Sequence, residues 1–530
     1  MPGFRTSLTM APLVLRGCAL AACLAYLGLA ARKTGAVLPG ETALLEWLAH
    51  WVMPARPAWT GSLGSLAAQE VLVLQTGLFF AVASALFFES IRAVLRSPLP
   101  PRHVMPLVLG FSAALRLGAV AIPAVLETDQ HRYHWDGAVL MAGFNPYEFT
   151  PAEVAREAAR TAPAATGSRT DRAARLTRLA AIAREPALAA HFTRINHPEV
   201  ATFYPPAAQA LFGLARSVSP GSDAVLKGLV ALLDLGVTAL TAVLLLRLGK
   251  DPRWAVAYGW CPLVIKEYAG TGHADPLAGL LVLASLLCLL GGRRTAGGLA
   301  LGTAVLARLY PLVLLPVLGR RLGRSGMLAF ALAVAAGYGP FIEHGGPMLN
   351  GLGAFASRWE FNSSIPALIT AGLQPLFNRH DPVTLTVALT RKDGEERLLL
   401  ASQNLDAFFW AKGLCAIALA IVLFALAWRP PRDDAGLVAR SGLAVAALLV
   451  LSPVADPWYF GWVAPFACLF PSAAAAWLAW GMSLYYFYFL AWAYPWWSRP
   501  LEYGPAALLL ALDARRWRRG VRVDGLPRGL

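Results

Sequence analysis

Long apolar runs with almost no charge recur along most of the chain. Residues 229–246, 277–290 and 407–428 are clear cases, and polar or basic residues flank each of them. A run of roughly 20 apolar residues allows a helix to cross the hydrocarbon core of a membrane. Lipid offers no hydrogen-bond partner to the backbone, so such runs must form helices. The short alternating segments of an outer-membrane barrel do not occur in the sequence.

The composition agrees with a membrane protein. Hydrophobic residues make up 57% of the chain and charged residues 15%, whereas a soluble domain has about 25% charged residues. The net charge of +15 comes mainly from short links and from a basic run near the C-terminus, Arg515-Arg516-Trp517-Arg518-Arg519. The positive-inside rule explains this pattern, so we expect no nucleic-acid partner. The six cysteines lie in apolar runs without metal or disulfide spacing, which indicates small buried hydrophobic residues.

The charges of the short links predict the topology. Basic residues mark the cytoplasmic links near positions 92–102, 247–253, 293–294, 320–324 and 429–440. Two long polar segments, residues 127–205 and 343–406, are then extracytoplasmic. The first apolar stretch, residues 17–31, is similar to a signal peptide, but we interpret it as an uncleaved first span. We expect one all-α integral membrane domain over residues 1–530, with about eleven to thirteen crossings.

Two segments depart from simple spans. Residues 154–192, in the middle of the first long polar segment, are rich in Ala and Arg and predict amphipathic helix on the surface. Residues 296–318 have cytoplasmic links at both ends, so a single crossing would violate the charge rule. We therefore expect two half-helices that are broken at Tyr310-Pro311, with the irregular backbone buried in protein or lining a cavity.

Polar chemistry gathers in the segments that are predicted to lie outside. The densest cluster is residues 127–137, which combine acids, an arginine, two histidines and aromatic residues. Aromatic rings stack on sugars, carboxylates accept protons from hydroxyl groups, and arginine binds phosphate with two parallel hydrogen bonds. Seven of the nine histidines fall in these outer segments: His131, His134, His191, His197, His273, His344 and His380. The sequence thus favours a catalytic outer face, although loops are also polar for other reasons.

An ordered series of short motifs extends from about residue 127 to residue 459. It comprises Asp129-x-x-Arg132-Tyr133-x-Trp135-Asp136-Gly137, Gly143-x-Asn145-Pro146-Tyr147, Ile195-Asn196-His197-Pro198-Glu199, Tyr204-Pro205-Pro206, Gly272-His273-Ala274-Asp275, Arg308-Leu309-Tyr310-Pro311 and Ser452-Pro453-Val454-Ala455-Asp456-Pro457-Trp458-Tyr459. In this order the motifs resemble those of the GT-C superfamily of membrane glycosyltransferases. The similarity is to bacterial polyprenyl-phosphate-mannose-dependent mannosyltransferases and to the first mannosyltransferase of glycosylphosphatidylinositol synthesis.

The resemblance implies a GT-C-like fold with an acidic base in the first outer segment. That role maps onto Asp129, with Asp136 as the second candidate. Cations expected at the donor phosphate are Arg132, Arg308 and Lys266. Expected substrate-binding residues are Tyr133, Trp135, Asn145, His197, Tyr204, His273, Asp275 and Tyr310. The chain departs from the family pattern at Arg308, where relatives often have Lys, and at Asp456, where His is expected.

Simpler interpretations stand beside several of these roles. His273 and Asp275 are also typical of a helix start with a satisfied histidine. Arg308 could serve packing or extend toward the interface, and Lys266 could form an ion pair with Glu267. The C-terminal aromatic group is more typical of an interfacial belt than of a platform for a sugar: Tyr485, Tyr486, Tyr488, Trp492, Tyr494, Trp496 and Trp497.

The sequence therefore favours a transferase that moves a hexose, mannose being the commonest case in the family, from a polyprenyl-phosphate carrier to a lipid or glycan acceptor. A single displacement with an Asp base would invert the anomeric carbon. The alternatives are a transporter or flippase of lipid-linked sugars, a ligase that uses a diphosphate carrier and a non-catalytic scaffold. We assign no cofactor and no metal ligands, and metal dependence stays open. The expected location is the cytoplasmic membrane of a bacterium, since the chain is rich in Ala, Arg and Leu.

Overall fold

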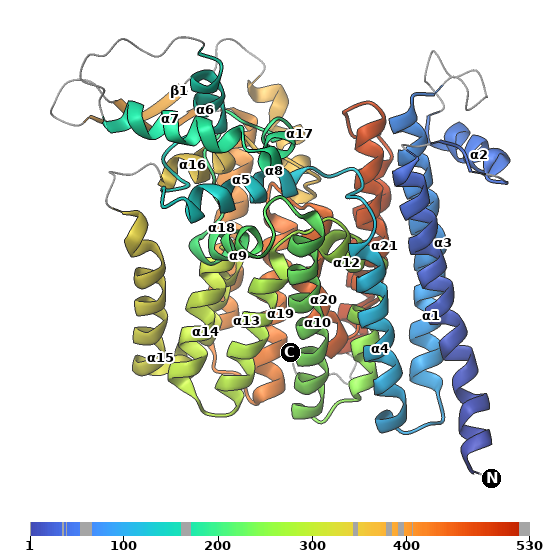
Figure 1. Ribbon diagram of the computed structural model, residues 1–530. Coiled ribbons are helices and arrows are strands. Elements are labelled where there is room, and N and C mark those ends of the chain that lie inside the picture. Colours follow the sequence, from blue (N-terminus) through green and yellow to red (C-terminus); the bar gives the residue numbers. More distant parts are fainter. Residues whose placement is uncertain are drawn as a thin grey trace.

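The computed structural model describes residues 2–33, 36–38, 40–53, 66–160, 171–342, 348–377, 384–390, 397–404 and 406–518. Long helices stand side by side, and shorter helices gather over one end of this bundle (Figure 1). We call the end that carries residues 127–205 the loop end. The opposite end, where the links 97–100, 248–251 and 429–433 lie, is called the basic end.

The regular elements that the structure describes in the N-terminal half are all helices. Before the first long polar segment come α1 (Pro2–Arg32), α2 (Thr42–Val52), α3 (Ala68–Arg96) and α4 (Pro101–Val120). That segment contains α5 (Asp129–Met141), α6 (Pro151–Ala158), α7 (Asp171–Ala183) and α8 (Pro186–Phe192). Next come α9 (Pro206–Val218), α10 (Asp223–Arg247), η2 (Pro252–Ala255), α11 (Val256–Gly259), α12 (Pro262–Ile265) and the π-helical turn η3 (Lys266–Gly270).

The C-terminal half adds further helices and one hairpin. These helices are α13 (Asp275–Leu290), α14 (Arg294–Ala307), η4 (Tyr310–Leu314), α15 (Leu315–Tyr338), η5 (Gly339–Phe341), α16 (Met348–Arg358) and α17 (Ile365–Phe377). Strands β1 (Thr384–Thr390) and β2 (Arg397–Asn404) follow. The last elements are α18 (Ala407–Trp428), α19 (Asp434–Leu451), η6 (Pro457–Tyr459), α20 (Phe460–Leu469), α21 (Ala473–Gly481), η7 (Met482–Leu490) and α22 (Ser498–Arg518).

Six helices of the described chain are long and apolar enough to cross a membrane. They are α1 from Met10, α3, α4, α10, α18 and α19. The pair Pro262–Gly270 and Asp275–Leu290, bent by 115°, would make a seventh span if it counts as one. The expectation of an all-α polytopic membrane protein is therefore confirmed. The total of eleven to thirteen crossings, which counts shorter segments too, stays a prediction.

Local sequence explains where the spans begin. The carboxylate of Asp406 accepts a hydrogen bond from the backbone N–H of Phe409, which caps α18, and Asp433 caps α19 in the same way through Gly436. The middle of α18 exposes Ile417, Ile421 and Phe424. Because a helix in lipid needs no polar face, this exposed apolar side is what a lipid-facing span requires.

The expected break between residues 296 and 318 is present. Helix α14 ends at Ala307, and Arg308 has an extended backbone with φ −152° and ψ 150°. Arg308 pairs with Asp275 at the start of α13, whereas Arg321 donates to the carbonyl of Leu289 near the end of α13. The chain therefore rises along α14, turns at Arg308 and returns to the basic end beside α13. Both ends of this segment lie at the basic end, as two half-helices require.

The remainder of α15 rises again along α14. At Gly323 the backbone is left-handed, with φ 59°, and this residue separates the descending part from the rising part. A Cβ atom at Gly298 of α14 would lie 1.9 Å from the carbonyl oxygen of Gly326. The glycine is therefore needed for the backbones to touch, as in small-residue interfaces of membrane helices.

Basic side chains tie neighbouring helices together at the basic end. Arg253 donates to the carbonyl of Ser97 at 2.9 Å, and Arg320 donates to the carbonyl of Trp428 at 3.1 Å. Cations next to the last carbonyls of a helix also compensate its dipole. The links predicted to be cytoplasmic thus share one end of the bundle.

The two long polar segments pack against each other at the loop end. The rings of Phe203 and Phe355 stack at 4.7 Å, and the rings of His197 and Trp359 meet edge-on at 4.8 Å. Their common location agrees with the predicted topology. The compartment that this end faces stays a prediction.

The first polar segment has its own small core, and the second contains the hairpin. Buried apolar residues of α5, α6, α7 and α8, among them Trp135, Val154, Leu179 and Leu188, form one cluster. This accounts for the expected amphipathic helices; residues 161–170 lie outside the described residues. Strands β1 and β2 pair antiparallel with a bulge between Val387 and Ala388. The all-α expectation contained no such hairpin, which is local and peripheral.

Candidate functional site

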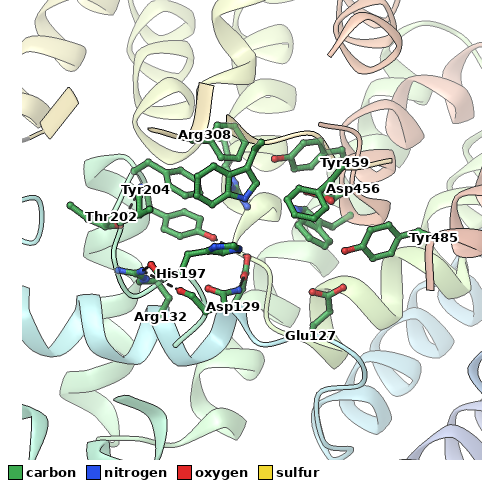
Figure 2. A pocket seen from close by; sticks show the side chains of 18 residues that line it. Glu127, Asp129, Arg132, His197, Thr202, Tyr204, Arg308, Asp456, Tyr459 and Tyr485 are labelled. Atoms are coloured by element: carbon green, nitrogen blue, oxygen red, sulfur yellow. Dashed lines mark hydrogen bonds between the residues drawn. The ribbon is translucent and has the colours of Figure 1, made fainter. Parts of the chain in front are cut away.

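A pocket lies at the loop end, between the first polar segment and the bundle (Figure 2). It encloses about 800 Å³ of space, part of which is open to solvent. Its charged and polar lining consists of Glu127, Asp129, Arg132, Asn196, His197, Thr202, Tyr204, Arg308, Asp456, Tyr459 and Tyr485. Its other lining residues include Phe203, Phe355, Trp359, Phe361 and Trp458. Segments far apart in the sequence therefore meet here.

Asp129 is the first residue of α5, and its carboxylate faces the pocket. Asn196 donates from Nδ2 to Oδ1 at 2.9 Å, and the hydroxyl of Tyr204 donates to Oδ2 at 3.0 Å. Burial alone would raise the pKa of Asp129. The nearby His273 and the two hydrogen bonds outweigh burial, so the pKa lies below its ordinary value of 3.8. The carboxylate is therefore ionised at neutral pH and oriented by fixed donors.

His273 lies directly behind Asp129. Its Nε2 is 3.8 Å from Oδ2 of Asp129, and this nitrogen has no hydrogen-bond partner within the described structure. Its Nδ1 is 3.0 Å from a carboxylate oxygen of Glu267, and its ring stacks on Trp458 at 4.0 Å. His273 thus stands between two carboxylates. Glu267 belongs to the π-helical turn η3, a geometry that is frequent at functional sites.

Arg308 reaches the pocket from the break after α14. Its guanidinium donates to Asp275 Oδ2 at 2.6 Å, and the other oxygen of Asp275 accepts from the indole of Trp462 at 2.8 Å. The guanidinium carbon also lies 5.1 Å from the centre of the Tyr204 ring. Asp275 is fully buried and does not line the pocket, whereas Arg308 does. Asp275 therefore compensates and positions a cation that faces the pocket.

Arg132 and His197 shape the opposite wall. Arg132 donates to the carbonyl of His197 at 2.9 Å, which fixes the turn that carries Asn196. His197 has a left-handed backbone, φ 47°, and its ring meets that of Trp359 edge-on at 4.8 Å. Almost half of the His197 side chain is exposed. The arginine is thus a second cation at the pocket, and the histidine and tryptophan form its rim.

Two further acids line the pocket beside Asp129. Burial raises the pKa of Glu127 well above 4.5, and the nearby charge of Glu267 raises it further. Burial likewise raises the pKa of Asp456 well above 3.8, with the charges of Asp129 and Glu267 adding to the effect. Asp456, where the family pattern has His, therefore sits at the site itself. Asp129 is the acid of this group whose environment favours the ionised form.

The second candidate base, Asp136, and one expected phosphate-binding cation, Lys266, do not line the pocket. Asp136 is buried two turns further along α5 and accepts a hydrogen bond from Gln209 at 3.2 Å. Burial outweighs its attraction to Arg132 and raises its pKa to about 6. Lys266 is buried against Glu267 at 2.8 Å and Tyr486 at 2.9 Å. The ion-pair interpretation therefore accounts for the contacts of Lys266, and Asp136 lies behind the pocket rather than in its wall.

Three predicted substrate contacts do not line the pocket. Tyr133 stacks on Phe212 at 4.4 Å behind the pocket, and its hydroxyl donates to Oδ2 of Asp129 at 3.5 Å. Trp135 belongs to the separate core of the first polar segment. Asn145 accepts from the backbone N–H of Tyr147 at 3.0 Å, in the turn after α5. Because α5 is helical, Tyr133 lies on the same face as Asp129, whereas Trp135 faces other neighbours.

An apolar groove adjoins the pocket at Arg308. Phe203, Arg308, Phe355 and Tyr459 line both spaces. The groove continues along Leu309, Tyr310, Val313, Leu352, Leu448, Val454 and Trp462. Tyr310, a predicted substrate contact, therefore lines this groove and stacks on Trp462 at 4.4 Å. The polar pocket and the apolar groove thus meet at the guanidinium of Arg308.

Sequence reasoning missed several lining residues. Asn196 and Tyr459 lay within the quoted motifs but were given no role. Tyr485 was assigned to an interfacial belt, yet it is buried and lines the pocket, and Tyr486 beside it is buried too. Trp492 and Trp496 are exposed, as a belt requires. His344 and His380 lie outside the described residues.

Comparison with known proteins yields no relative: no family model, no curated protein and no solved structure matches the chain.

Proposed function

We propose that the protein is a membrane glycosyltransferase that transfers a hexose, such as mannose, from a polyprenyl-phosphate carrier to a hydroxyl of a lipid or glycan acceptor. The observation that carries this proposal is the meeting of an ionised carboxylate, two arginines and an apolar groove at one pocket. The pocket supplies groups for each part of such a donor. We further propose that the pocket opens on the extracytoplasmic side of a bacterial cytoplasmic membrane.

Asp129 is the general base of this reaction. The acceptor oxygen attacks the anomeric carbon while its proton passes to the Asp129 carboxylate. The bond between that carbon and the phosphate oxygen breaks, and the polyprenyl phosphate leaves with the bonding pair. One displacement inverts the anomeric centre. Tyr204 and Asn196 hold the carboxylate toward the pocket, which is the preorganisation that such a base needs.

Arg308 and Arg132 stabilise the departing phosphate. Both line the pocket with Asp129, and guanidinium groups form strong paired hydrogen bonds with phosphate. Negative charge builds on the leaving group as the bond breaks, so these contacts strengthen in the transition state. The apolar groove on the far side of Arg308 suits the first isoprene units of the carrier.

Aromatic side chains are the natural sugar contacts. Trp359 and Phe355 line the pocket near the exposed His197 ring, and Tyr459 lines it near Arg308. Flat rings bind the apolar faces of hexoses, and nearby polar groups fix the hydroxyls. This set takes over the role that the sequence assigned to Tyr133 and Trp135.

The test is an assay with purified protein in liposomes that contain a radiolabelled polyprenyl-phosphate sugar. A transferase releases free polyprenyl phosphate and labels an acceptor, whereas a flippase moves the intact carrier across the bilayer without cleavage. Carrier movement without cleavage would contradict the proposal. Matched proteoliposomes with Asp129→Asn serve as the control, since the substitution preserves the shape of the side chain.

A further inference from the structure

A histidine cluster lies on the other side of α5 from the pocket. His134 of α5, His191 of α8 and Asp223 at the start of α10 each place a ligand atom within 4.8 Å of the other two. Nε2 of His134 is 2.9 Å from Oδ1 of Asp223, and the two imidazole rings are 4.1 Å apart. Three elements that are distant in the sequence thus present three metal-binding groups to one point.

The hydrogen bonds of His191 set its tautomer. Its Nε2 lies 3.1 Å from the carbonyl oxygen of Gly221, which can only accept, so this nitrogen carries the proton. In the neutral ring, Nδ1 then carries the lone pair, which accepts from Nδ1 of His131 at 2.9 Å, and a bound cation would replace His131 as its partner. A metal-binding histidine typically donates its other ring N–H to a carbonyl or carboxylate. The Gly221 contact is therefore the arrangement that orients a ligand.

Burial and access also fit a bound cation. The His134 side chain is only 3% exposed, whereas that of Asp223 is 46% exposed, so the cluster opens to solvent on the Asp223 side. Lys227, one turn further along α10, turns away and donates to the carbonyl of Ile122. His131 lies outside the three-ligand set, and its hydrogen bond to Nδ1 of His191 is the contact that a bound cation would displace.

We propose that His134, His191 and Asp223 form a binding site for a divalent transition-metal ion, with zinc as the expected ion. Two imidazoles and one carboxylate suit zinc, and three protein ligands leave one coordination position for water. The metal would join α5 and α8 of the first polar segment to the start of α10. It would thereby pin the segment that carries Asp129 onto the bundle. This inference does not depend on the proposed transferase activity.

Sequence spacing could not have shown this site. His134 and His191 are separated by several helices, and Asp223 begins another one. Metal motifs are recognised when their ligands are close in sequence, whereas here the fold alone brings them together.

The test uses full-length protein in detergent after its metals are removed with a chelator. Titration with Co²⁺ should give one equivalent per chain and the visible absorption bands of a low-coordinate site, and Zn²⁺ should displace them. His134→Ala and His191→Ala should weaken binding by more than about 100-fold. His131→Ala should not weaken binding, because His131 only occupies the lone pair that the metal would take. His103→Ala removes an exposed histidine at the opposite end of the bundle and should bind like wild type.

The half-exposed Asp223 provides a variant that should fold. Asp223→Asn keeps the shape of the side chain and should by itself weaken Co²⁺ binding by about 10-fold or more, the range of a perturbed metal site. At the same zinc concentration, zinc should also raise the melting temperature of the wild-type protein and of His103→Ala more than that of Asp223→Asn. The proposal is overturned if wild-type protein binds no more Co²⁺ than Asp223→Asn, or if His103→Ala lowers binding equally.

Discussion

Arg308 pairs with the buried Asp275 and also lines the pocket. Arg308→Gln should therefore affect both the stability of the bundle and the activity. The guanidinium is 2.6 Å from a carboxylate of Asp275 whose side chain is fully buried. Removal of one partner from a buried pair costs about 3–5 kcal/mol, because the other charge is left uncompensated. Arg308→Gln should therefore lower the melting temperature even if Arg308 never touches a substrate.

A second variant separates the two effects. Arg308→Gln combined with Asp275→Asn removes both charges, and replacement of both partners is far less costly than removal of one. Trp462 loses little, because an amide oxygen can still accept its hydrogen bond. The double variant should therefore recover most of the lost melting temperature. If Arg308 binds phosphate, this recovery of stability does not restore activity.

The expected loss of kcat/KM follows from the strength of a hydrogen bond between Arg308 and the donor phosphate. A hydrogen bond to a charged group contributes about 1.5–3 kcal/mol, which corresponds to about 10-fold to 150-fold in kcat/KM. We expect a loss in this range for the polyprenyl-phosphate donor in both the single and the double variant. Arg308→Lys should retain part of the activity, since the charge remains but the paired geometry is lost.

The assay measures kcat and donor KM on detergent-purified protein, with melting temperature recorded on the same samples. The reasoning is refuted if the double variant regains wild-type kcat/KM together with its stability. In that case Arg308 would only neutralise Asp275, and the donor phosphate would bind elsewhere.

Three other predictions address the base, the bundle and the topology. Asp129→Asn should lower turnover by about 10²-fold without a large change in donor KM. In the wild-type protein the pKa of Asp129 lies below 3.8, so its carboxylate stays ionised as the pH falls. The activity of the wild-type protein should therefore decline only below about pH 4. Arg116 and Asp234 form a buried ion pair at 2.8 Å. Arg116→Leu should destabilise the protein by about 3–5 kcal/mol, and Arg116→Leu combined with Asp234→Leu by much less. Melting temperatures measure both effects, and an equal loss of stability in the two variants would argue against a stabilising pair. A cysteine at the exposed Glu199 should react with an impermeant thiol reagent added outside intact cells, and one at the exposed Arg293 should not; the reverse pattern would invert the topology.

The apolar pattern predicted the helices better than it predicted the site. The run 407–428 coincides with α18, because a lipid-facing helix carries its own signal of length and apolarity. A break in this segment was also predicted, at Tyr310-Pro311, since charged links at both ends of a short apolar segment leave few topologies. The chain leaves the helix slightly earlier, at Arg308. The β1–β2 hairpin has no counterpart in that argument, because the second polar segment is not constrained by lipid.

Only some of the predicted site residues line the pocket, and the geometry of α5 explains why the others do not. Asp129, Arg132, His197, Tyr204 and Arg308 line the pocket as the motifs indicated. Within α5, however, helical geometry turns neighbouring motif residues toward the core. The ion pair between Lys266 and Glu267 joins neighbours in the sequence and was one of the interpretations considered. The hydrogen bonds of Lys266 with Tyr486 and of Asp136 with Gln209 join distant segments, and no local pattern encodes them.

The distribution of histidines was visible in the sequence, but the way in which the fold groups them was not. Their concentration outside the spans was visible in the sequence, but it pointed only to a polar outer face. The fold separates His273, which supports Asp129 at the pocket, from His134 and His191, which meet Asp223 on the other side of α5. The histidines of the predicted outer segments thus belong to two separate sites.

The most direct test of the central claim is donor cleavage by the purified protein. Liposomes that contain a radiolabelled polyprenyl-phosphate mannose and a mixed pool of lipid and glycan acceptors are incubated with wild-type protein or with Asp129→Asn. The account predicts that wild-type protein releases polyprenyl phosphate and transfers the label to an acceptor with inverted anomeric configuration, at a rate about 10²-fold above that of the variant. Equal rates for the two proteins, or label that stays on the carrier across a panel of hexose donors, would contradict it.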